Sequence, residues 1–364
     1  MLIGIDGNEA NTTQRVGSNI YAFELISEIV KQDHGNEYLI YLREKRATDL
    51  PSNWHYRVIP PKKLWTQWRL PLDLYLHKPR PDIFFTPGHY APRFSPVPTV
   101  ISILDLAFLK FPQFFKPAVL AQLKSWTSYS VKQARHIFAI SEHTKQDIIS
   151  AYAVNPDKIT VTYPGVHPRF RKSYSPDQIK AIMAQYHLPG QYFIFVGTRQ
   201  PRKNLDKLVQ AIEQIPNANL VIVGKTWHQF RSETNPERSR RANSNIIELG
   251  FVPDEDLPPI MLGAQALILP SLYEGFGFPA AEAMAIGTPV IASNVSSLPE
   301  IVGESGILID PKSITSITEG LHAVVSLSNQ KRVQLTKSAQ ERSRRFTWAN
   351  CANRTLEVLH VIAA

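Results

Sequence analysis

Two glutamates near a predicted helix start have the clearest potential chemistry in this sequence. In PSLYEGFGFPAAEAM, Glu274 lies in a glycine-containing loop after an apolar strand, and Glu282 lies in the first turn of a helix that begins near Pro279. Carboxylates at such a place bind phosphate poorly, but they accept strong hydrogen bonds from neutral diols such as the hydroxyls of ribose or a hexose. An acidic residue in a first turn also stabilises the helix dipole, so Glu282 has two interpretations.

A basic cluster follows an earlier predicted strand. Arg199, Arg202 and Lys203 lie in GTRQPRKN, between the strand YFIFVG (192–197) and a helix that begins at Asn204. In parallel α/β sheets, ligands bind outside the carboxyl ends of the strands, and helix N-termini attract phosphate. The cluster therefore lies where ligands bind, although each residue alone is also consistent with a solvated surface position.

The elements that must position these side chains alternate along the chain. Apolar segments of strand length are separated by amphipathic stretches, of which the first, Ser18–Lys31, places Ile20, Phe23, Ile26 and Val30 on one helical face. The predicted strands are LIGI (2–5), YLIYL (38–42), YRVI (56–59), DIFF (82–85), TVISIL (99–104), HIFAI (136–140), ITVT (159–162), YFIFVG (192–197), ANLVIVG (218–224), NIIELG (245–250), ALILPS (266–271), TPVIAS (288–293) and GILID (306–310). This alternation predicts parallel sheets covered by helices.

Length and composition predict a two-domain globular protein. The chain has 364 residues, of which 43% are hydrophobic and 20% charged, and this excludes disorder as the main state. The strand–helix pattern lapses between residues 168 and 190, as a linker would, so we expect an N-terminal domain over 1–170 and a C-terminal domain over 185–345. The formal charge of +9 suits phosphorylated ligands, polyanions and anionic lipid surfaces alike.

The cysteine count and the first residues predict a cytoplasmic location. Cys351 is the single cysteine, which excludes an internal disulfide and Cys-rich zinc sites. No segment approaches the roughly 18 apolar residues that span a bilayer. The start, MLIGIDGNEAN, lacks a basic n-region and is expected to form a strand rather than a signal peptide.

The string EGFGFPAAEAMAIGTPVIAS, with Glu274 and Glu282, resembles the donor-site signature of retaining glycosyltransferase family 4, the group 1 glycosyl transferases. Other segments resemble the family in order along nearly the whole chain: GIDGNEANTTQRVGSNIYAFEL, LWTQWRLP, SILDLAFLKFPQFF, ISEHTKQDIISAY, ITVTYPGVHPRF, VGTRQPRKNLDKLVQA, LGFVPDEDLP and SSLPEIVGESGILIDP. The resemblance implies the GT-B fold, with two facing Rossmann-like domains and a C-terminal helix, about 347–364, that crosses back onto the first domain.

The resemblance also implies an activity, the transfer of a hexose from a nucleotide diphosphate sugar to a hydroxyl acceptor with retention of anomeric configuration. The closest-looking motifs are mannosyltransferase-like, so GDP-mannose is the expected donor, followed by UDP-glucose. The expected acceptor is a growing surface polysaccharide or a lipid-linked oligosaccharide. The diphosphate would leave on the front face and help to deprotonate the acceptor, with cations stabilising its charge, so neither a metal nor another cofactor is expected.

Individual site residues follow from the same resemblance. Arg199 and Lys203 would bind the donor diphosphate, with Arg202 as the competing arginine, and Glu282 would hold the ribose. Gly17 in RVGSN would let the backbone approach the donor phosphate or the acceptor, and the backbone of Phe251 and Val252 would lie beside the nucleobase. The signature loop would supply further donor contacts from Glu274, which is also expected to take part in catalysis, and from Gly275, Phe276, Gly277 and Phe278.

One position departs from the family pattern. Many members carry His-Asp-Leu after the strand that here reads TVISIL, whereas this chain has Leu104-Asp105-Leu106. Leucine can neither accept a proton nor donate a hydrogen bond, so another group must replace the histidine or the donor phosphate must suffice. The candidates are Asp105, which is also suited to capping its loop, and His89 in TPGHYAP, whose unperturbed pKa near 6.5 suits proton transfer.

Other patterns leave different functions open. Gly275-x-Gly277-x-x-Ala280 matches a dinucleotide fingerprint, so an NAD-dependent oxidoreductase is an alternative, although TPVIAS ends without the acidic residue that would bind a ribose. Asp254 and Asp256 have the spacing of metal-dependent transferases but also suit an acidic helix start. No histidine pair has metal-ligand spacing.

Two basic segments favour a non-enzymatic binding protein as the remaining alternative. Residues 61–81, PKKLWTQWRLPLDLYLHKPRP, have the composition of a helix at an anionic membrane surface, or of a core helix with a basic rim. Arginines also cluster at Arg231, Arg238, Arg240 and Arg241, as on a nucleic-acid-binding surface. No known nucleic-acid-binding motif accompanies them, so nucleic acid is not an expected partner.

Overall fold

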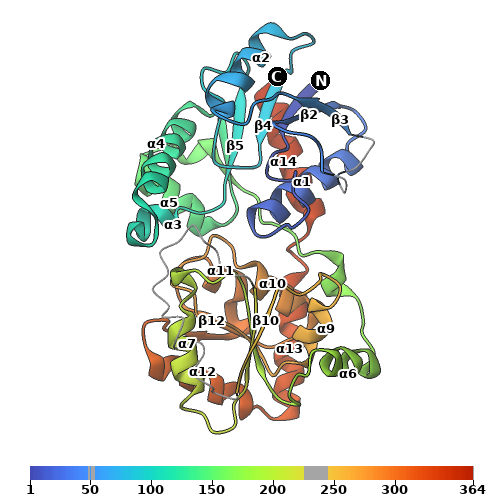
Figure 1. Cartoon of the computed structure of the whole chain (residues 1–364), viewed down its shortest axis with the longest axis vertical. Coiled ribbons are helices and arrows are strands. Elements are labelled where there is room, and N and C mark those ends of the chain that lie inside the picture. Colours follow the sequence, from blue (N-terminus) through green and yellow to red (C-terminus); the bar gives the residue numbers. More distant parts are fainter. Residues whose placement is uncertain (48–49, 51–53, 225–244, 364) are drawn as a thin grey trace. The chain divides into compact units, whose positions relative to one another are not determined.

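The computed structural model describes residues 1–47, 50, 54–224 and 245–363. The arginine cluster at 231–241 lies outside these residues. The chain divides into two compact units, the first formed by Met1–Leu109, Ala118–Gly165 and Phe346–Ala364 and the second by Lys110–Pro117 and Val166–Arg345 (Figure 1). The stretch in which the strand–helix pattern lapses belongs to the second unit, where it forms η4 (Pro168–Arg171) and α6 (Pro176–Gln185).

A seven-stranded parallel sheet forms the centre of the first unit. Its strands are β1 (Leu2–Asp6), β2 (Glu37–Leu42), β3 (His55–Val58), β4 (Ile83–Thr86), β5 (Thr99–Ile103), β6 (His136–Ala139) and β7 (Ile159–Val161), in the order β3-β2-β1-β4-β5-β6-β7. Strands β2 and β3 are added on one side of β1, and strands β4 to β7 are added in order on its other side, so the strand order reverses between β1 and β4. Right-handed crossovers on the two sides of that point place helices on opposite faces. The central strands β4 and β5 are accordingly buried along their whole length.

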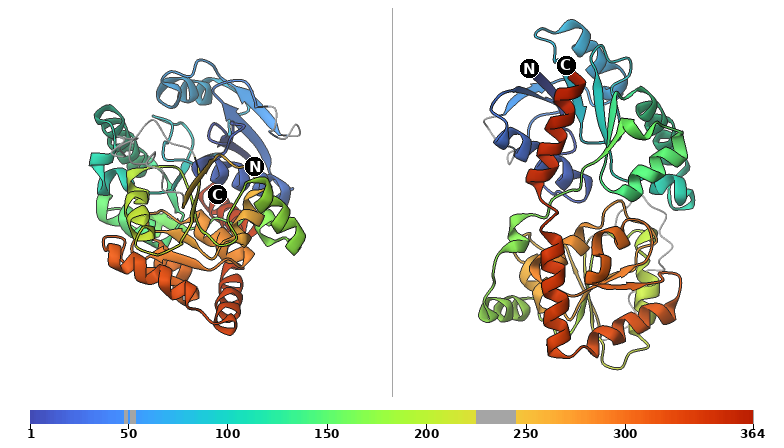
Figure 2. Two further views of the ribbon diagram at one scale, coloured as in Figure 1. Left: turned by 60° about the horizontal axis from the view of Figure 1, so that its bottom comes forward. Right: turned by 180° about the vertical axis from the view of Figure 1, so that it is seen from behind.

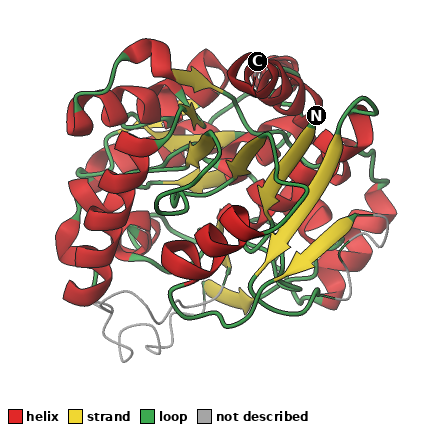
Figure 3. Cartoon of the chain, turned by 90° about the horizontal axis from the view of Figure 1, so that it is seen from above, coloured by secondary structure: helices red, strands yellow, loops and turns green. Residues whose placement is uncertain are grey.

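Helices flank the strands of the first unit, as the colouring by secondary structure shows (Figure 3). They are α1 (Ser18–Gln32), η1 (Trp65–Arg69), α2 (Leu70–Leu76), α3 (Ala107–Lys110), α4 (Pro117–Gln133), α5 (Glu142–Tyr152), η3 (Pro156–Lys158) and α14 (Trp348–Ala363). The predicted buried face of α1 was wrong by about one position. The helix buries Tyr21, Ala22, Leu25, Ile26 and Ile29. The Tyr21 hydroxyl forms a hydrogen bond with Ser102 in β5, whereas the Phe23 ring packs on Trp54.

The last helix of the chain packs within the first unit. Helix α14 contacts α1 and β4 and runs alongside the strands of that unit (Figure 2, right). The ring of its first residue, Trp348, packs against the Tyr21 ring at a tilt of 56°, with the ring centroids 6.1 Å apart. Gly165 allows this contact, because a Cβ atom there would lie 2.1 Å from the Trp348 nitrogen.

A six-stranded parallel sheet forms the centre of the second unit. Its strands are β8 (Phe193–Val196), β9 (Leu220–Val223), β10 (Ile246–Gly250), β11 (Leu267–Leu269), β12 (Val290–Ser293) and β13 (Ile307–Ile309), in the order β10-β9-β8-β11-β12-β13. The helical elements are η2 (Pro112–Phe114), η4, α6, η5 (Pro201–Lys203), α7 (Leu205–Ile212), α9 (Leu257–Gly263), α10 (Phe278–Ile286), α11 (Leu298–Val302), η6 (Gly303–Ser305), α12 (Ile314–Val325) and α13 (Asn329–Ser343). In this sheet the strand order reverses between β8 and β11.

The predicted fold class is confirmed. Each strand in the described part of the chain overlaps a segment that the apolar pattern had predicted, and both sheets are parallel and doubly wound. In such sheets the loops after the two strands that flank the reversal point diverge and leave room for a ligand. The candidate site positions are therefore the residues after β8 and β11 in the second unit and those after β1 and β4 in the first.

Candidate functional site

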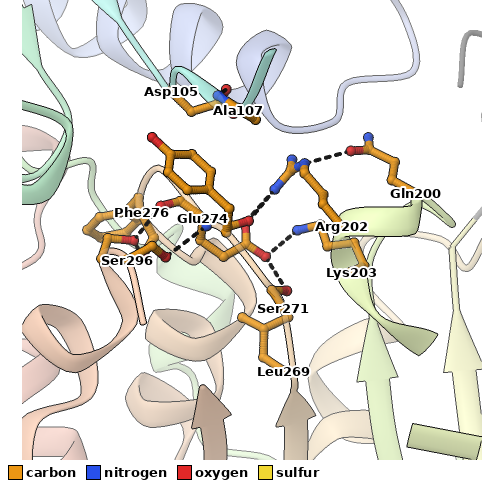
Figure 4. Close-up of polar contacts among 12 residues, drawn as sticks. Asp105, Ala107, Gln200, Arg202, Lys203, Leu269, Ser271, Glu274, Phe276 and Ser296 are labelled. Carbon is orange, nitrogen blue, oxygen red and sulfur yellow. Dashed lines mark hydrogen bonds and ion pairs between the residues drawn. The ribbon is translucent and has the colours of Figure 1, made fainter. Parts of the chain in front are cut away.

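Glu274 binds both basic side chains of the η5 turn at the reversal point of the second unit. Lys203 Nζ donates to Glu274 Oε1 at 2.5 Å, and Arg202 Nη1 donates to Glu274 Oε2 at 3.2 Å (Figure 4). The Ser271 hydroxyl donates to Oε1 at 2.7 Å. The two segments follow β8 and β11, so side chains that lie 71 positions apart in sequence meet at one edge of the sheet.

This cluster keeps Glu274 ionised and carries an excess positive charge. Burial alone would raise the pKa of Glu274, but attraction to Lys203 and Arg202 outweighs it and lowers the pKa to about 2. Two cations surround one carboxylate, so the group has a net charge of +1 at neutral pH. A preorganised positive charge in a largely buried place stabilises an anion more strongly than the same charge in water.

Further hydrogen bonds, most of them to backbone carbonyls, fix the basic turn in place. Arg202 Nη1 also donates to the Tyr273 carbonyl at 2.7 Å, and its Nε donates to Gln200 at 2.8 Å. Asn204 adopts the left-handed conformation with φ of 60° and ends the turn. Its Nδ2 donates to the carbonyls of Pro270 and Pro311, which ties the turn to the ends of β11 and β13. These bonds leave the arginine and lysine head groups little rotational freedom.

The glycine loop before α10 is held by two serines. Ser297 Oγ donates to the carbonyls of Glu274 and Phe276, both at 3.0 Å, and the Glu274 N–H donates to Ser296 Oγ at 2.9 Å. Gly277 begins α10 with φ of 100°, and a Cβ there would lie 2.6 Å from the Leu298 side chain. The Phe276 and Phe278 rings pack at 5.3 Å. The predicted donor loop from Glu274 to Phe278 is thus a single rigid turn.

Glu282 lies in a different environment from Glu274. Helix α10 is apolar apart from Glu282 and is buried from Ala280 to Ile286, and Glu282 is only 8% exposed. Burial raises its pKa to about 8, although the nearby Arg169 lowers it and Asp254 raises it. Arg169 itself pairs with Asp254 at 2.7 Å. Among the described residues, no side chain or backbone group donates a hydrogen bond to the Glu282 carboxyl, which therefore keeps its acceptor capacity.

Arg199 has another partner in this structure. Its Nη2 pairs with Glu248 Oε2 in β10 at 2.5 Å, so Arg202 and not Arg199 joins Lys203 at Glu274. Phe251 and Val252 follow directly after β10; Phe251 is 47% exposed and Val252 is buried. Neither the composition of GTRQPRKN nor its spacing distinguishes the two arginines, because their partners come from distant strands.

In the first unit, Glu9 organises the loop around Gly17. Gly17 begins α1 with φ of 50°, and a Cβ there would meet open space. Glu9 Oε2 accepts from the Ser18 hydroxyl at 2.9 Å and from Asn19 Nδ2 at 3.0 Å. Glu9 is not among the sequence-predicted site residues, although its place a few positions after the first strand of a parallel sheet is a signal that indicates it.

His89 contacts the backbone at the position where the family histidine is missing. The Leu104 N–H donates to His89 Nε2 at 3.0 Å, so the neutral ring carries its proton on Nδ1. Burial lowers the pKa of His89, although Asp105 and Glu9 raise it. Asp105 Oδ1 accepts from the Ala107 N–H at 3.0 Å, which is the capping role considered for it (Figure 4).

The described residues contain neither a metal-ligand cluster nor a membrane-spanning helix. In those ranges no group of three or more His, Cys, Asp or Glu side chains is placed to hold a metal ion. Asp254 is paired with Arg169, and Asp256 accepts from the Tyr186 hydroxyl at 2.7 Å. None of the helices in the described part of the chain is long and apolar enough to span a bilayer.

Comparison with known families and proteins gives consistent matches along the chain. Residues 180–342 match the family "Glycosyl transferases group 1", and residues 16–170 match "Glycosyltransferase Family 4". The O-antigen chain mannosyltransferase B of Escherichia coli is 30% identical over 315 residues, which are 84% of this chain and 79% of that protein. The serotype-specific mannosyltransferase WbdA of Escherichia coli is 28% identical over 237 residues, 62% of this chain but 29% of that longer protein.

Solved structures match over the whole length. Sucrose-phosphate synthase from Thermosynechococcus elongatus superimposes with a TM-score of 0.78 at 20% identity, covering 99% of this chain and 98% of that one. Anabaena HepE in complex with UDP and glucose gives a TM-score of 0.77 at 19% identity, covering 99% of each chain. At these identities the structural likeness concerns the fold.

Proposed function

The chain belongs to glycosyltransferase family 4, the retaining group 1 glycosyl transferases with the GT-B fold, and from this premise we propose that it transfers a hexose from a nucleotide diphosphate sugar to a hydroxyl acceptor. The observation that carries the proposal is the buried cluster of Arg202, Lys203 and Glu274 at the reversal point of the second sheet. Family membership takes the place of the oxidoreductase and non-enzymatic alternatives.

The cluster suits the departure of a diphosphate. As the bond between the sugar and the diphosphate breaks, negative charge develops on the phosphate oxygens, and Lys203 and Arg202 stabilise it without moving. Such preorganised electrostatic stabilisation is commonly the largest contribution to catalysis. Glu274 orients both cations, and the donor loop through Gly275, Phe276 and Gly277 presents its backbone to the same ligand. Arg199 reaches the diphosphate only if it leaves Glu248.

The remaining donor contacts follow the same arrangement. Glu282 accepts hydrogen bonds from the ribose hydroxyls, for which its carboxyl has no competing donor among the described residues. The backbone of Phe251 and Val252 lies beside the nucleobase, and Gly17 lets the first unit's backbone approach the phosphate or the acceptor. The family signature supports these assignments.

GDP-mannose is the proposed donor, followed by UDP-glucose. The names of two relatives, both mannosyltransferases, support the first, and the complex of Anabaena HepE with UDP and glucose supports the second. Thermal-shift and calorimetric measurements with GDP, UDP, ADP and NAD test the proposal directly. Stabilisation by GDP in preference to UDP is expected, and stabilisation by NAD with no response to any nucleoside diphosphate would overturn it.

The proposed acceptor is a hydroxyl of a growing surface polysaccharide or of a lipid-linked oligosaccharide. The name of one relative, the O-antigen chain mannosyltransferase B, supports a saccharide acceptor. A cytoplasmic location, with contact at the inner face of the membrane, fits a sugar-nucleotide donor and a single buried Cys351.

His89 is proposed to assist the reaction as a hydrogen-bond donor. Its Nε2 is taken by the Leu104 N–H, so the ring offers Nδ1–H to a sugar hydroxyl rather than a free base. Because removing one positioned hydrogen-bond donor typically costs about 10²–10³ in rate, we expect His89→Ala to lower turnover at least tenfold, with donor binding changed less than about threefold. Initial rates and calorimetric titration measure the two quantities.

Asp105→Asn provides the matched comparison for His89. The amide oxygen of asparagine can still accept from the Ala107 N–H, so this variant should keep near-normal turnover. A defect confined to Asp105→Asn would reverse the assignment. If neither variant is impaired, the donor phosphate alone deprotonates the acceptor, and Leu104 is a packing residue.

Turnover is expected to be independent of divalent metal. Lys203 and Arg202 supply the positive charge that a metal would otherwise provide, and Asp254 and Asp256 already bind Arg169 and Tyr186. Rates in excess EDTA should match those of untreated enzyme. If chelation abolished turnover and manganese or magnesium restored it, Asp254 and Asp256 would become the candidate ligands.

A further inference from the structure

A surface of exposed apolar side chains lies on η1 and α2 of the first unit. Twelve large apolar side chains are exposed in the described part of the chain, and five of them fall between residues 64 and 76: Leu64, Trp68, Leu72, Tyr75 and Leu76. Trp68 is 67% exposed and Leu76 is 73% exposed. We call these five side chains the α2 face. Such a concentration within thirteen positions is unlike the isolated exposed apolar residues that any protein carries.

The α2 face is not needed to hold the helix in place. The opposite side of η1 and α2 buries Trp65, Leu70 and Leu74 in a core cluster with Tyr41 and Phe84. Trp65 also donates its indole N–H to the Ile59 carbonyl at 3.0 Å. Within the exposed set, Trp68, Leu72 and Tyr75 follow the i, i+4, i+7 spacing of a single helical stripe. The segment is therefore apolar on two sides, one of which faces the core and the other solvent.

Basic residues surround the α2 face. Between residues 60 and 80 the sequence contains Lys62, Lys63, Arg69, His77, Lys78 and Arg80, against one acidic residue, Asp73. Asp73 is neutralised by Arg57, whose Nε and Nη2 each donate to it at 2.6 Å. Lys62 pairs with Glu44, whereas Lys63 and Lys78 are exposed and have no acidic partner among the described residues. The rim is thus strongly positive.

A neighbouring loop is tied to η1 through its backbone, where the Arg93 N–H donates to the Thr66 carbonyl at 3.0 Å. Its side chains pack elsewhere. Phe94 is 69% exposed, but its ring lies 6.4 Å from the Tyr129 ring of α4, and the Arg93 guanidinium lies over the same ring. The α2 face therefore consists of the five side chains named above.

We propose that the α2 face docks this protein on the surface of an anionic lipid bilayer. Trp68, Leu72 and Leu76 enter the headgroup region, and Lys63 and Lys78 contact the lipid phosphates. Large apolar side chains beside basic ones are the chemistry that a helix lying in an anionic interface requires. The same positive rim opposes pairing with the α2 face of a second copy, because like charges would meet there. The docking does not depend on the transfer reaction.

Flotation with lipid vesicles tests the proposal on the full-length protein. At low salt the protein should float with vesicles that contain phosphatidylglycerol and not with pure phosphatidylcholine vesicles. Binding should fall as salt rises, because exposed charges are screened over about 10 Å at 0.1 M salt. Equal recovery on neutral and anionic vesicles, or no recovery on either, would overturn the proposal.

Two double variants separate the apolar from the ionic contribution. Lys63→Gln with Lys78→Gln should weaken binding to anionic vesicles about 30-fold, since each basic residue near an anionic surface contributes about 1 kcal/mol. Trp68→Ser with Leu72→Ser should weaken it at least tenfold. The matched controls on α13, Lys331→Gln with Lys337→Gln and the single change Val333→Ser, should bind as the unaltered protein does.

Three further measurements control for misfolding, for damage to the donor site and for self-association. Thermal melts establish that each variant is folded, and nucleoside diphosphate binding should be unchanged, since no substituted residue belongs to the donor site. Sedimentation velocity checks for self-association; a dimer that the Trp68 and Leu72 changes dissolve would identify the α2 face as a contact between copies and contradict membrane docking. Unchanged vesicle binding in both double variants would contradict it as well.

Discussion

Replacing Lys203 with alanine should lower the rate of hexose transfer by about 10²–10³-fold, the loss typical when one preorganised donor to a developing anion is removed. Lys203 is buried, and its Nζ lies 2.5 Å from Glu274 Oε1, so its positive charge is held in one place. Because hydrogen bonds to charged groups contribute about 1.5–3 kcal/mol, nucleoside diphosphate binding should weaken about ten- to a hundredfold. Steady-state rates and calorimetric titration measure these effects.

The same substitution should also destabilise the fold, and the two effects can be separated. Removing one partner of a buried ion pair costs about 3–5 kcal/mol, because the remaining charge is left uncompensated; Arg202 retains part of the compensation here. Adding Glu274→Gln to Lys203→Ala should restore stability without restoring turnover. The matched control is Lys207→Ala, at a lysine on the following helix whose Nζ donates to the Lys312 carbonyl, and this variant should be near normal. Unchanged diphosphate affinity in a folded Lys203→Ala protein would refute the assignment.

Replacing Glu282 with glutamine should remove a large pH dependence of the unfolding free energy. Burial raises the pKa of Glu282 from 4.5 to about 8 in the folded protein. Between these two values the folded state holds a proton that the unfolded state releases, so stability falls as pH rises from about 4.5 to about 8 and is level on either side. At 1.36 kcal/mol per pKa unit, the fall attributable to this group is roughly 5 kcal/mol.

The difference between the two proteins isolates the Glu282 contribution. Glutamine does not ionise, so Glu282→Gln should match the unaltered protein near pH 4.5 and exceed it by several kcal/mol at pH 8.5 in urea unfolding measurements. Its nucleoside diphosphate affinity at pH 8.5, where Glu282 is mostly ionised, should nevertheless fall, because an amide accepts weaker hydrogen bonds from ribose hydroxyls than a carboxylate does. Glu341→Gln, an exposed position on α13, should show neither effect. If the unfolding free energies of the variant and the unaltered protein changed in parallel at every pH, the proposal that folded Glu282 is a buried, protonated carboxyl would be contradicted.

Much of the fold could be predicted from the sequence because its signals are local. Apolar segments such as TVISIL and TPVIAS have strand length and are bounded by turn residues, and they became β5 and β12. The order of strands and helices then left few topologies, since parallel crossovers are short and right-handed. The buried face of α1 was misjudged by one position because helical periodicity alone does not determine which of two adjacent apolar stripes meets the sheet; the hydrogen bond of Tyr21 to Ser102, 81 residues away, does.

For the site, the sequence alone indicated candidate residues for binding a sugar nucleotide, and the tertiary structure decided how their side chains are paired. Arg199 and Arg202 are equivalent in GTRQPRKN, but β10 presents Glu248 to the first and the loop after β11 presents Glu274 to the second. Glu274 and Glu282 are both carboxylates eight positions apart, yet one has a pKa of about 2 and the other of about 8. Charge state depends on burial and on neighbours from distant strands, and a linear motif contains neither. His89 reached the backbone of Leu104 for the same reason, since the ends of β4 and β5 meet only when the sheet forms.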